Sequence, residues 1–83
     1  MKNKILIKVY VPNIDDEFEV FIPSNESIKK IIDIIVKSIN ELSSNILSSK
    51  NYCLLDLETS KIYNFVKLVR NTNIRNGSKI ILL

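Results

Sequence analysis

The chain has 83 residues, of which 46% are hydrophobic and 25% charged, with one glycine and two prolines. This composition is typical of a small folded protein, so we expect a single domain over residues 1–83 and exclude collagen-like and low-complexity sequences. Basic residues exceed acidic ones by 12 − 9 = 3, which gives a net charge of +3. Histidine is absent, which removes the side chain that most often transfers protons at neutral pH.

The cysteine content and the start of the chain predict where the protein resides. Cys53 is the one cysteine, so no internal disulfide is possible, although secreted domains of this size usually need several. The start is basic, but Lys8 interrupts the following apolar run after three residues and leaves no signal-peptide core. No segment approaches the roughly 18 uncharged apolar residues of a membrane span. We therefore expect a cytoplasmic protein without direct membrane insertion.

Two alternating segments near the start predict an antiparallel hairpin. In residues 4–11 the β-branched residues share one parity, and residues 17–22 alternate in the same way. The residues between them, 12–16, carry turn-forming side chains.

A helix is predicted after the hairpin, with Ser27 or Asn25 as its N-cap. Apolar residues then recur with spacings of three and four and form one stripe, at positions 28, 31, 32, 35, 39 and 42. Ile34 lies off this stripe, where it is either a partner contact or ordinary surface.

The second half of the chain gives weaker signals. We expect Ile46 and Leu47 to attach a polar connector to the core, and Asn76-Gly77 to form a tight turn because both residue types tolerate positive φ. The remaining predicted elements are a strand, a short strand, a helical turn and a final strand, at residues 52–57, 62–63, 67–70 and 78–83.

This order of elements predicts an α+β domain in which one main helix covers a mixed sheet of four to five strands. The order resembles the β-grasp, or ubiquitin-like, fold. Residues 18–22 with 28–34, and the closing segment 74–83 with its glycine turn and short apolar strand, are similar to the YukD/EsaB family of small bacterial ubiquitin-like proteins.

The resemblance to YukD/EsaB implies a non-enzymatic accessory or regulatory protein of the type VII (Ess/Yuk) secretion system of Gram-positive bacteria. It implies action by protein-protein interaction with cytosolic parts of a membrane secretion machine, without a cofactor, metal or small-molecule substrate. The alternatives are a ubiquitin-like adaptor in another pathway and a weak nucleic-acid-binding domain.

The residues themselves give little sign of chemistry. Conjugated ubiquitin-like proteins end in a slim Gly-Gly tail, whereas residues 80–83 are bulky and apolar. Cys53 lies on an apolar strand parity without a histidine to deprotonate it, which favours a core role over a catalytic one. The acidic residues between positions 15 and 19 lack the glycine and ligand spacing of a calcium loop, so we interpret them as a solvated face.

A nucleic-acid interface has some support from charge. Five basic residues and no acidic residue follow Glu58, together with Tyr63 and Phe65. Phosphate binding needs a contiguous basic stripe, and base stacking needs exposed aromatic rings. Charges so widely spaced make this a weak signal.

A protein-binding patch is predicted from strand parity. If Cys53, Leu55 and Leu57 point inward and Ile80 and Leu82 do the same, the neighbouring residues point outward. Three of these outward residues form the predicted partner-binding patch, on the sheet face opposite the helix: Leu54, Ile81 and Leu83. A register shift of one residue would exchange the two faces.

Overall fold

The computed structural model describes residues 3–48 and 50–83. Met1 and Lys2, in the basic start of the chain, and Ser49, in the polar connector, lie outside the described residues. The regular elements are β1 (Lys4–Val11), β2 (Asp16–Pro23), α1 (Ile28–Leu42), β3 (Leu54–Asp56) and β4 (Lys79–Leu82). Short 3-10 turns lie at Pro12–Ile14 and Val69–Asn71.

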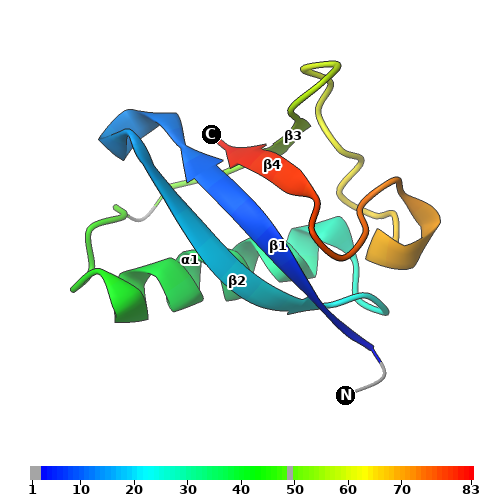
Figure 1. Ribbon diagram of the computed structural model, residues 1–83, viewed down its shortest axis with the longest axis horizontal. Coiled ribbons are helices and arrows are strands. Elements are labelled where there is room, and N and C mark those ends of the chain that lie inside the picture. Colours follow the sequence, from blue (N-terminus) through cyan, green and yellow to red (C-terminus); the bar gives the residue numbers. More distant parts are fainter. Residues whose placement is uncertain (1–2, 49) are drawn as a thin grey trace.

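The strands form one mixed sheet in the order β2-β1-β4-β3. β1 pairs antiparallel with β2 and parallel with β4, and β4 pairs antiparallel with β3. The helix α1 lies behind this sheet in the view of Figure 1 and covers one of its faces. The predicted α+β architecture is confirmed, with four strands and one main helix in the part of the chain that the structure describes.

The hairpin of β1 and β2 has the predicted parity. Ile7, Val9 and Val11 are buried on β1, and Val20 and Ile22 are buried opposite them on β2. The turn between the strands ends at Asp15, whose φ of 48° is a left-handed conformation that aspartate tolerates better than most residues. The alternation of apolar side chains therefore determines which face of this hairpin meets the helix.

The helix begins where the capping signal placed it. The Ser27 hydroxyl accepts a hydrogen bond from the Lys30 N–H at 3.2 Å, which satisfies one of the free amides of the first turn. Five isoleucines at the predicted stripe positions are buried: Ile28, Ile31, Ile32, Ile35 and Ile39. Full burial of such a side chain contributes about 1.5 to 3 kcal/mol, so this stripe is a principal source of stability.

The prediction for the end of the helix is partly wrong. Leu42, predicted to lie on the buried stripe, is 68% exposed, because the chain leaves the helix directly after it through residues 44 and 45, which both have positive φ. Leu47 joins the core instead, and the Asn40 side chain binds its backbone N–H and carbonyl at 2.8 and 3.3 Å. Ile46, expected beside Leu47, is exposed.

Residues 64–70, which show no hydrophobic period, are fixed by the segment that leads into α1. The Ile28 N–H donates to the Lys67 carbonyl at 2.9 Å, and the Val69 N–H donates to the Glu26 carbonyl at 2.9 Å. The helical turn predicted at 67–70 is the 3-10 turn Val69–Asn71, with Val69 buried. Backbone hydrogen bonds thus replace side-chain periodicity in ordering this connection.

The turn before β4 attaches the last strand to β1. Gly77 has a φ of 88°, as the Asn-Gly signal predicts, and its N–H donates to the Leu6 carbonyl at 2.7 Å. The Asn76 side chain accepts from the Leu6 N–H at 2.9 Å. Within residues 3–48 and 50–83, no helix combines the length and apolar character that crossing a membrane requires.

Candidate protein-binding surface

The outward residues of the final strand are those predicted. Ile80 and Leu82 are buried, while Ile81 is partly exposed and Leu83 is 44% exposed. Parity therefore places Ile81 and Leu83 on the open side of the sheet, away from α1. Their role in binding a partner stays a prediction.

The predicted parity of residues 52–57 is wrong, and Leu54 does not belong to the patch. Leu54 is fully buried and lies directly opposite the buried Leu82 in the antiparallel pair of β3 and β4. Directly opposite residues share a face, so burial of Leu82 requires Leu54 to point inward. Both parities of this segment are apolar, so the pattern alone could not choose between them.

Reversal of this parity brings Leu55 to the open face. Leu55 lies opposite Ile81 on β4, and Ile81 lies opposite Tyr10 on β1. On its other side, Leu55 forms an isolated antiparallel bridge with Ile62, which is 62% exposed. One continuous row of side chains thus crosses the open face and consists of Tyr10, Ile81, Leu55 and Ile62. We call this row the sheet-face patch.

The tyrosine end of the sheet-face patch is held by a hydrogen bond. The Tyr10 hydroxyl donates to Asp15 Oδ1 at 2.8 Å. This bond to the aspartate, with smaller contributions from burial and the charge of Asp15, raises the pKa of Tyr10 above its ordinary value. The hydrogen bond to Asp15 therefore fixes the position of the Tyr10 hydroxyl at this end of the patch.

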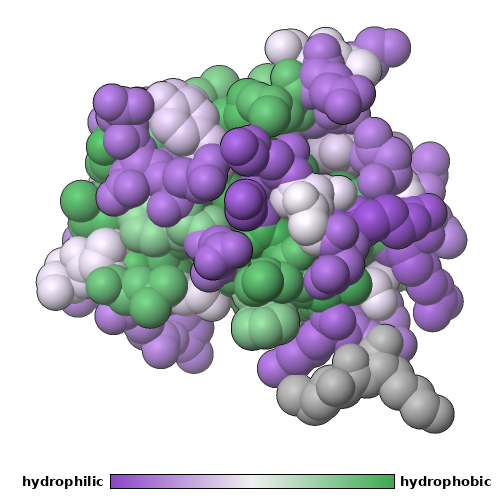
Figure 2. Space-filling model, viewed as in Figure 1, coloured by the Kyte–Doolittle hydropathy of each residue, from purple (hydrophilic) through white to green (hydrophobic). Residues whose placement is uncertain are grey.

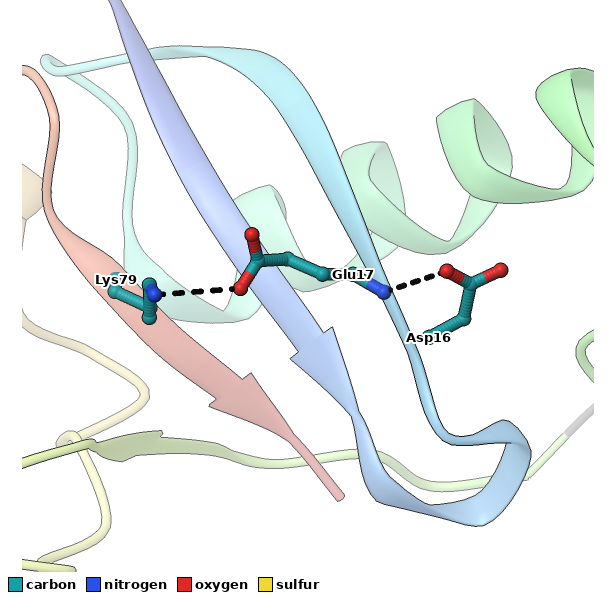
Figure 3. A network of polar contacts seen from close by, with 3 residues as sticks. All are labelled: Asp16, Glu17 and Lys79. Carbon is teal, nitrogen blue, oxygen red and sulfur yellow. Dashed lines mark hydrogen bonds and ion pairs between the residues drawn. The ribbon is translucent and has the colours of Figure 1, made fainter.

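A polar band borders the sheet-face patch. Glu17 on β2 extends over β1 to Lys79 on β4, with 3.5 Å between Oε1 and Nζ, as Figure 3 shows. Lys8 and Glu19 face each other in the neighbouring register position. Figure 2 shows this face, on which hydrophobic surface lies on either side of a hydrophilic band. Both partners of the ion pair are about half exposed, so its net contribution is within about 0 to 1 kcal/mol and its main effect is to delimit the patch.

A small polar network orders the chain beyond β3. The Asn73 amide donates to Asp56 Oδ2 at 2.8 Å, and the Tyr63 hydroxyl donates to Asn73 Oδ1 at 2.7 Å. The bond from Asn73, followed by one from the Glu58 N–H, lowers the pKa of the Asp56 carboxyl. Burial, and then the negative charge of Asp56, raise the pKa of Tyr63.

Cys53 lies beside the end of β4 and not in the core as predicted. It is partly exposed, and its thiol lies 3.7 Å from the Leu83 carbonyl. Its parity is that of Leu55, so the error has the same cause as that for Leu54. Leu57, also predicted to point inward, is 42% exposed.

The acidic residues after the first strand make local contacts. Asp15 binds Tyr10, Asp16 accepts from the Glu17 N–H at 2.8 Å, and Glu17 pairs with Lys79. Among the residues that the structure describes, no three Cys, Asp or Glu side chains lie together as a metal site would require.

Sequence reasoning missed three residues of the sheet-face patch. Tyr10 could have been found, because it has the outward parity of a strongly alternating strand. Leu55 would have followed from the correct parity of β3. Ile62 belongs to an isolated bridge outside the regular strands, and no hydrophobic period marks it.

Comparison with known proteins shows the fold. No protein-family model and no curated protein sequence matches the chain. Among solved structures, the EccD5 ubiquitin-like domain from Mycobacterium xenopi has a TM-score of 0.78 at 16% identity, with 96% of this chain and 92% of that chain covered. A chain of the MycP5-free ESX-5 inner membrane complex has a TM-score of 0.79 at 9% identity; 98% of this chain is covered, but it spans only 21% of that chain.

A third solved structure shows how widely the same architecture occurs. A chain of a toluene 4-monooxygenase complex has a TM-score of 0.73 at 5% identity, with 95% of each chain covered. Similarity at these sequence identities shows that the elements are arranged alike, and it does not show a common function. The sheet order, the single covering helix and the match to ubiquitin-like domains together show that this protein has the ubiquitin-like β-grasp fold.

Proposed function

We propose that this protein is a non-enzymatic accessory or regulatory component of a bacterial type VII (Ess/Yuk) secretion system, of the YukD/EsaB kind. It acts in the cytoplasm by binding a cytosolic part of the membrane secretion machine through the sheet-face patch.

Two similarities support a role in secretion. Residues 18–22 with 28–34, and residues 74–83, resemble the YukD/EsaB family in sequence. The fold is that of the EccD5 ubiquitin-like domain and of part of a chain in the ESX-5 inner membrane complex. Because unrelated functions share this fold, the function of this protein depends on its surface residues.

The single observation that carries the proposal is the sheet-face patch. Four apolar or aromatic side chains lie in register across three strands and a bridge, and none of them is fully buried. Clustered exposed apolar side chains bordered by charges are typical of protein contact sites. Tyr10 adds an aromatic ring, a residue type enriched among those that dominate binding energy.

The charge distribution does not favour the nucleic-acid alternative. Of the five basic residues after Glu58, Lys79 is paired with Glu17, and the Arg75 guanidinium donates to the carbonyls of Thr72 and Ile74 at 2.6 and 2.8 Å. Phosphate binding needs side chains that are available to neutralise a backbone. A ubiquitin-like adaptor in another pathway stays an alternative, which the identity of the partner distinguishes.

Affinity purification from the native bacterium tests the proposal. The tagged protein is expected to retain type VII membrane-machine subunits, and Ile62→Asp and Ile81→Thr are expected to reduce their recovery roughly tenfold or more. Threonine keeps the β-branching that β4 favours, so folding is expected to persist.

Phe21→Thr is the matched control for these two variants. Phe21 is 61% exposed on the same sheet face but lies outside the sheet-face patch. Its replacement is expected to leave recovery unchanged. Retention of unrelated proteins alone would support the adaptor, and equal recovery with folded Ile62→Asp would refute binding through this patch.

A further inference from the structure

A concave surface lies beside the helix, separate from the sheet-face patch. It is a groove of about 680 Å³ between α1, the connector before β3 and the loop at residues 65–66. Its apolar lining consists of Ile32, Val36, Tyr52, Phe65 and Val66. We call this surface the helix groove.

Two of the lining residues, Phe65 and Val66, are strongly exposed for apolar side chains. Phe65 is 43% exposed and Val66 is 81% exposed. Isolated exposed apolar residues are ordinary, but these two adjoin the apolar wall formed by Ile32 and Val36 in one depression. Together they form a concave apolar site of the size that side chains of a bound segment fill.

The backbone that presents Phe65 and Val66 is fixed before any partner binds. The Lys29 N–H, a free amide of the first helical turn, donates to the Phe65 carbonyl at 3.0 Å. The Val66 N–H donates to Asn64 Oδ1 at 3.0 Å, and the Lys67 carbonyl accepts from the Ile28 N–H at 2.9 Å. A preorganised site loses less conformational entropy on binding, which favours specific over nonspecific binding.

The charges at the helix groove select the kind of occupant. Lys29 on α1 and Lys50 on the connector both line it, against one acidic residue, Asp33. The Lys50 Nζ lies 4.9 Å from the centre of the Tyr52 ring, so a cation is held over the apolar floor. Neither lysine belongs to the ion pair found within the described part of the chain, which joins Lys79 and Glu17.

We propose that the helix groove binds a short segment of a partner protein in which apolar and acidic side chains alternate. The apolar side chains enter the space beside Ile32, Val36 and Phe65, and the carboxylates face Lys29 and Lys50. The match of an apolar floor with a net basic rim carries this assignment. With the sheet-face patch on the opposite side of the sheet, the protein then holds two partner segments at once.

Two synthetic peptides of equal length test the proposal by NMR titration of the full chain. Both contain leucine and phenylalanine; one has glutamate between them and the other has lysine. The glutamate peptide is expected to shift the amide signals of residues 32–36 and 65–66, and to bind roughly tenfold more tightly than the lysine peptide.

Charge reversal gives the sharper result. In the double variant Lys29→Glu with Lys50→Glu, the preference is expected to reverse toward the lysine peptide. Val66→Ser is expected to weaken both peptides, whereas Ile62→Asp, on the sheet-face patch, is expected to change neither. The proposal is overturned if neither peptide shifts the groove signals, if the shifts map elsewhere, or if charge reversal leaves the preference unaltered. Because Ile62→Asp affects only the sheet-face patch, failure here is distinguishable from failure of the proposed function.

Discussion

Cys53 and Leu83 exchange two backbone hydrogen bonds, from the Cys53 N–H to the Leu83 carbonyl at 2.9 Å and from the Leu83 N–H to the Cys53 carbonyl at 3.0 Å. This reciprocal pair extends the ladder of β3 and β4 by one residue at the end of the described chain. Residues 80–83 are therefore part of the sheet, and their outward side chains are held in position on its open face.

A variant that ends at Leu82 tests the contribution of this pair. We expect it to lose about 1 to 2 kcal/mol of unfolding free energy, because each net hydrogen bond contributes about 1 kcal/mol. Urea denaturation followed by circular dichroism measures the change. The Cys53 amide is also expected to exchange its hydrogen faster; unchanged exchange and stability would show that the pair does not form in solution.

Alanine substitutions at Leu54 and Leu55 test the parity of β3. Leu54 is fully buried, so Leu54→Ala leaves a cavity in the core and is expected to lower the unfolding free energy by about 2 to 5 kcal/mol. Leu55→Ala removes a partly exposed side chain and is expected to cost less than about 1.5 kcal/mol. Denaturant midpoints of the two variants compare the losses of unfolding free energy. A larger loss for Leu55→Ala than for Leu54→Ala would mean that Leu55, and not Leu54, faces the core.

The sequence predicts the elements in which one parity or one stripe is clearly apolar. β1, β2 and α1 are of this kind, and the serine at the start of α1 gives its first turn. The predicted positions of Leu42 and Ile46 are wrong because the helix ends in two residues with positive φ, Ser44 and Asn45. Serine and asparagine also occur at negative φ, so the sequence does not predict this end of the helix.

The candidate site is less predictable for a physical reason. Residues 52–57 have leucine on both parities, so only pairing with β4 decides that Leu54 is buried and Leu55 is outward. The helix groove depends on backbone hydrogen bonds between residues 24–29 and 64–70, which leave no pattern in the side chains. Ile81 and Leu83 were predictable, since Ile80 and Leu82 alternate with them.

A charge placed on the buried face of α1 is expected to unfold the protein. Ile32 is 6% exposed, and an aspartate there would leave a carboxylate without a partner beside the core, at a cost comparable to the total stability of a small domain. Ile34→Asp is the matched variant, at a partly exposed position off the stripe, and is expected to stay folded. Circular dichroism of both variants decides; a folded Ile32→Asp would contradict the packing of this face.

The pKa of Asp56 gives a prediction for acid conditions. Hydrogen bonds from Asn73 and Glu58 lower this pKa below the ordinary value of 3.8, so the folded state favours the charged carboxylate. This stabilisation is present above the unfolded-state pKa and is lost as the pH falls through the folded-state pKa. Asn73→Ala is expected to raise the pKa of Asp56 toward its ordinary value, which NMR titration of the carboxyl carbon measures. No upward movement would contradict the bond from Asn73.

The most direct test of the proposed function is photocrosslinking, in the organism that produces the protein, from a benzophenone side chain at position 62. Ile62 is the most exposed member of the sheet-face patch, and Leu42, 68% exposed at the end of α1, is the control position. We predict a crosslink from position 62 to a cytosolic part of a type VII membrane subunit and none to that subunit from position 42. Two results would contradict the proposed function. One is that position 62 crosslinks only to unrelated proteins, and the other is that the subunit crosslinks to position 42 and not to position 62.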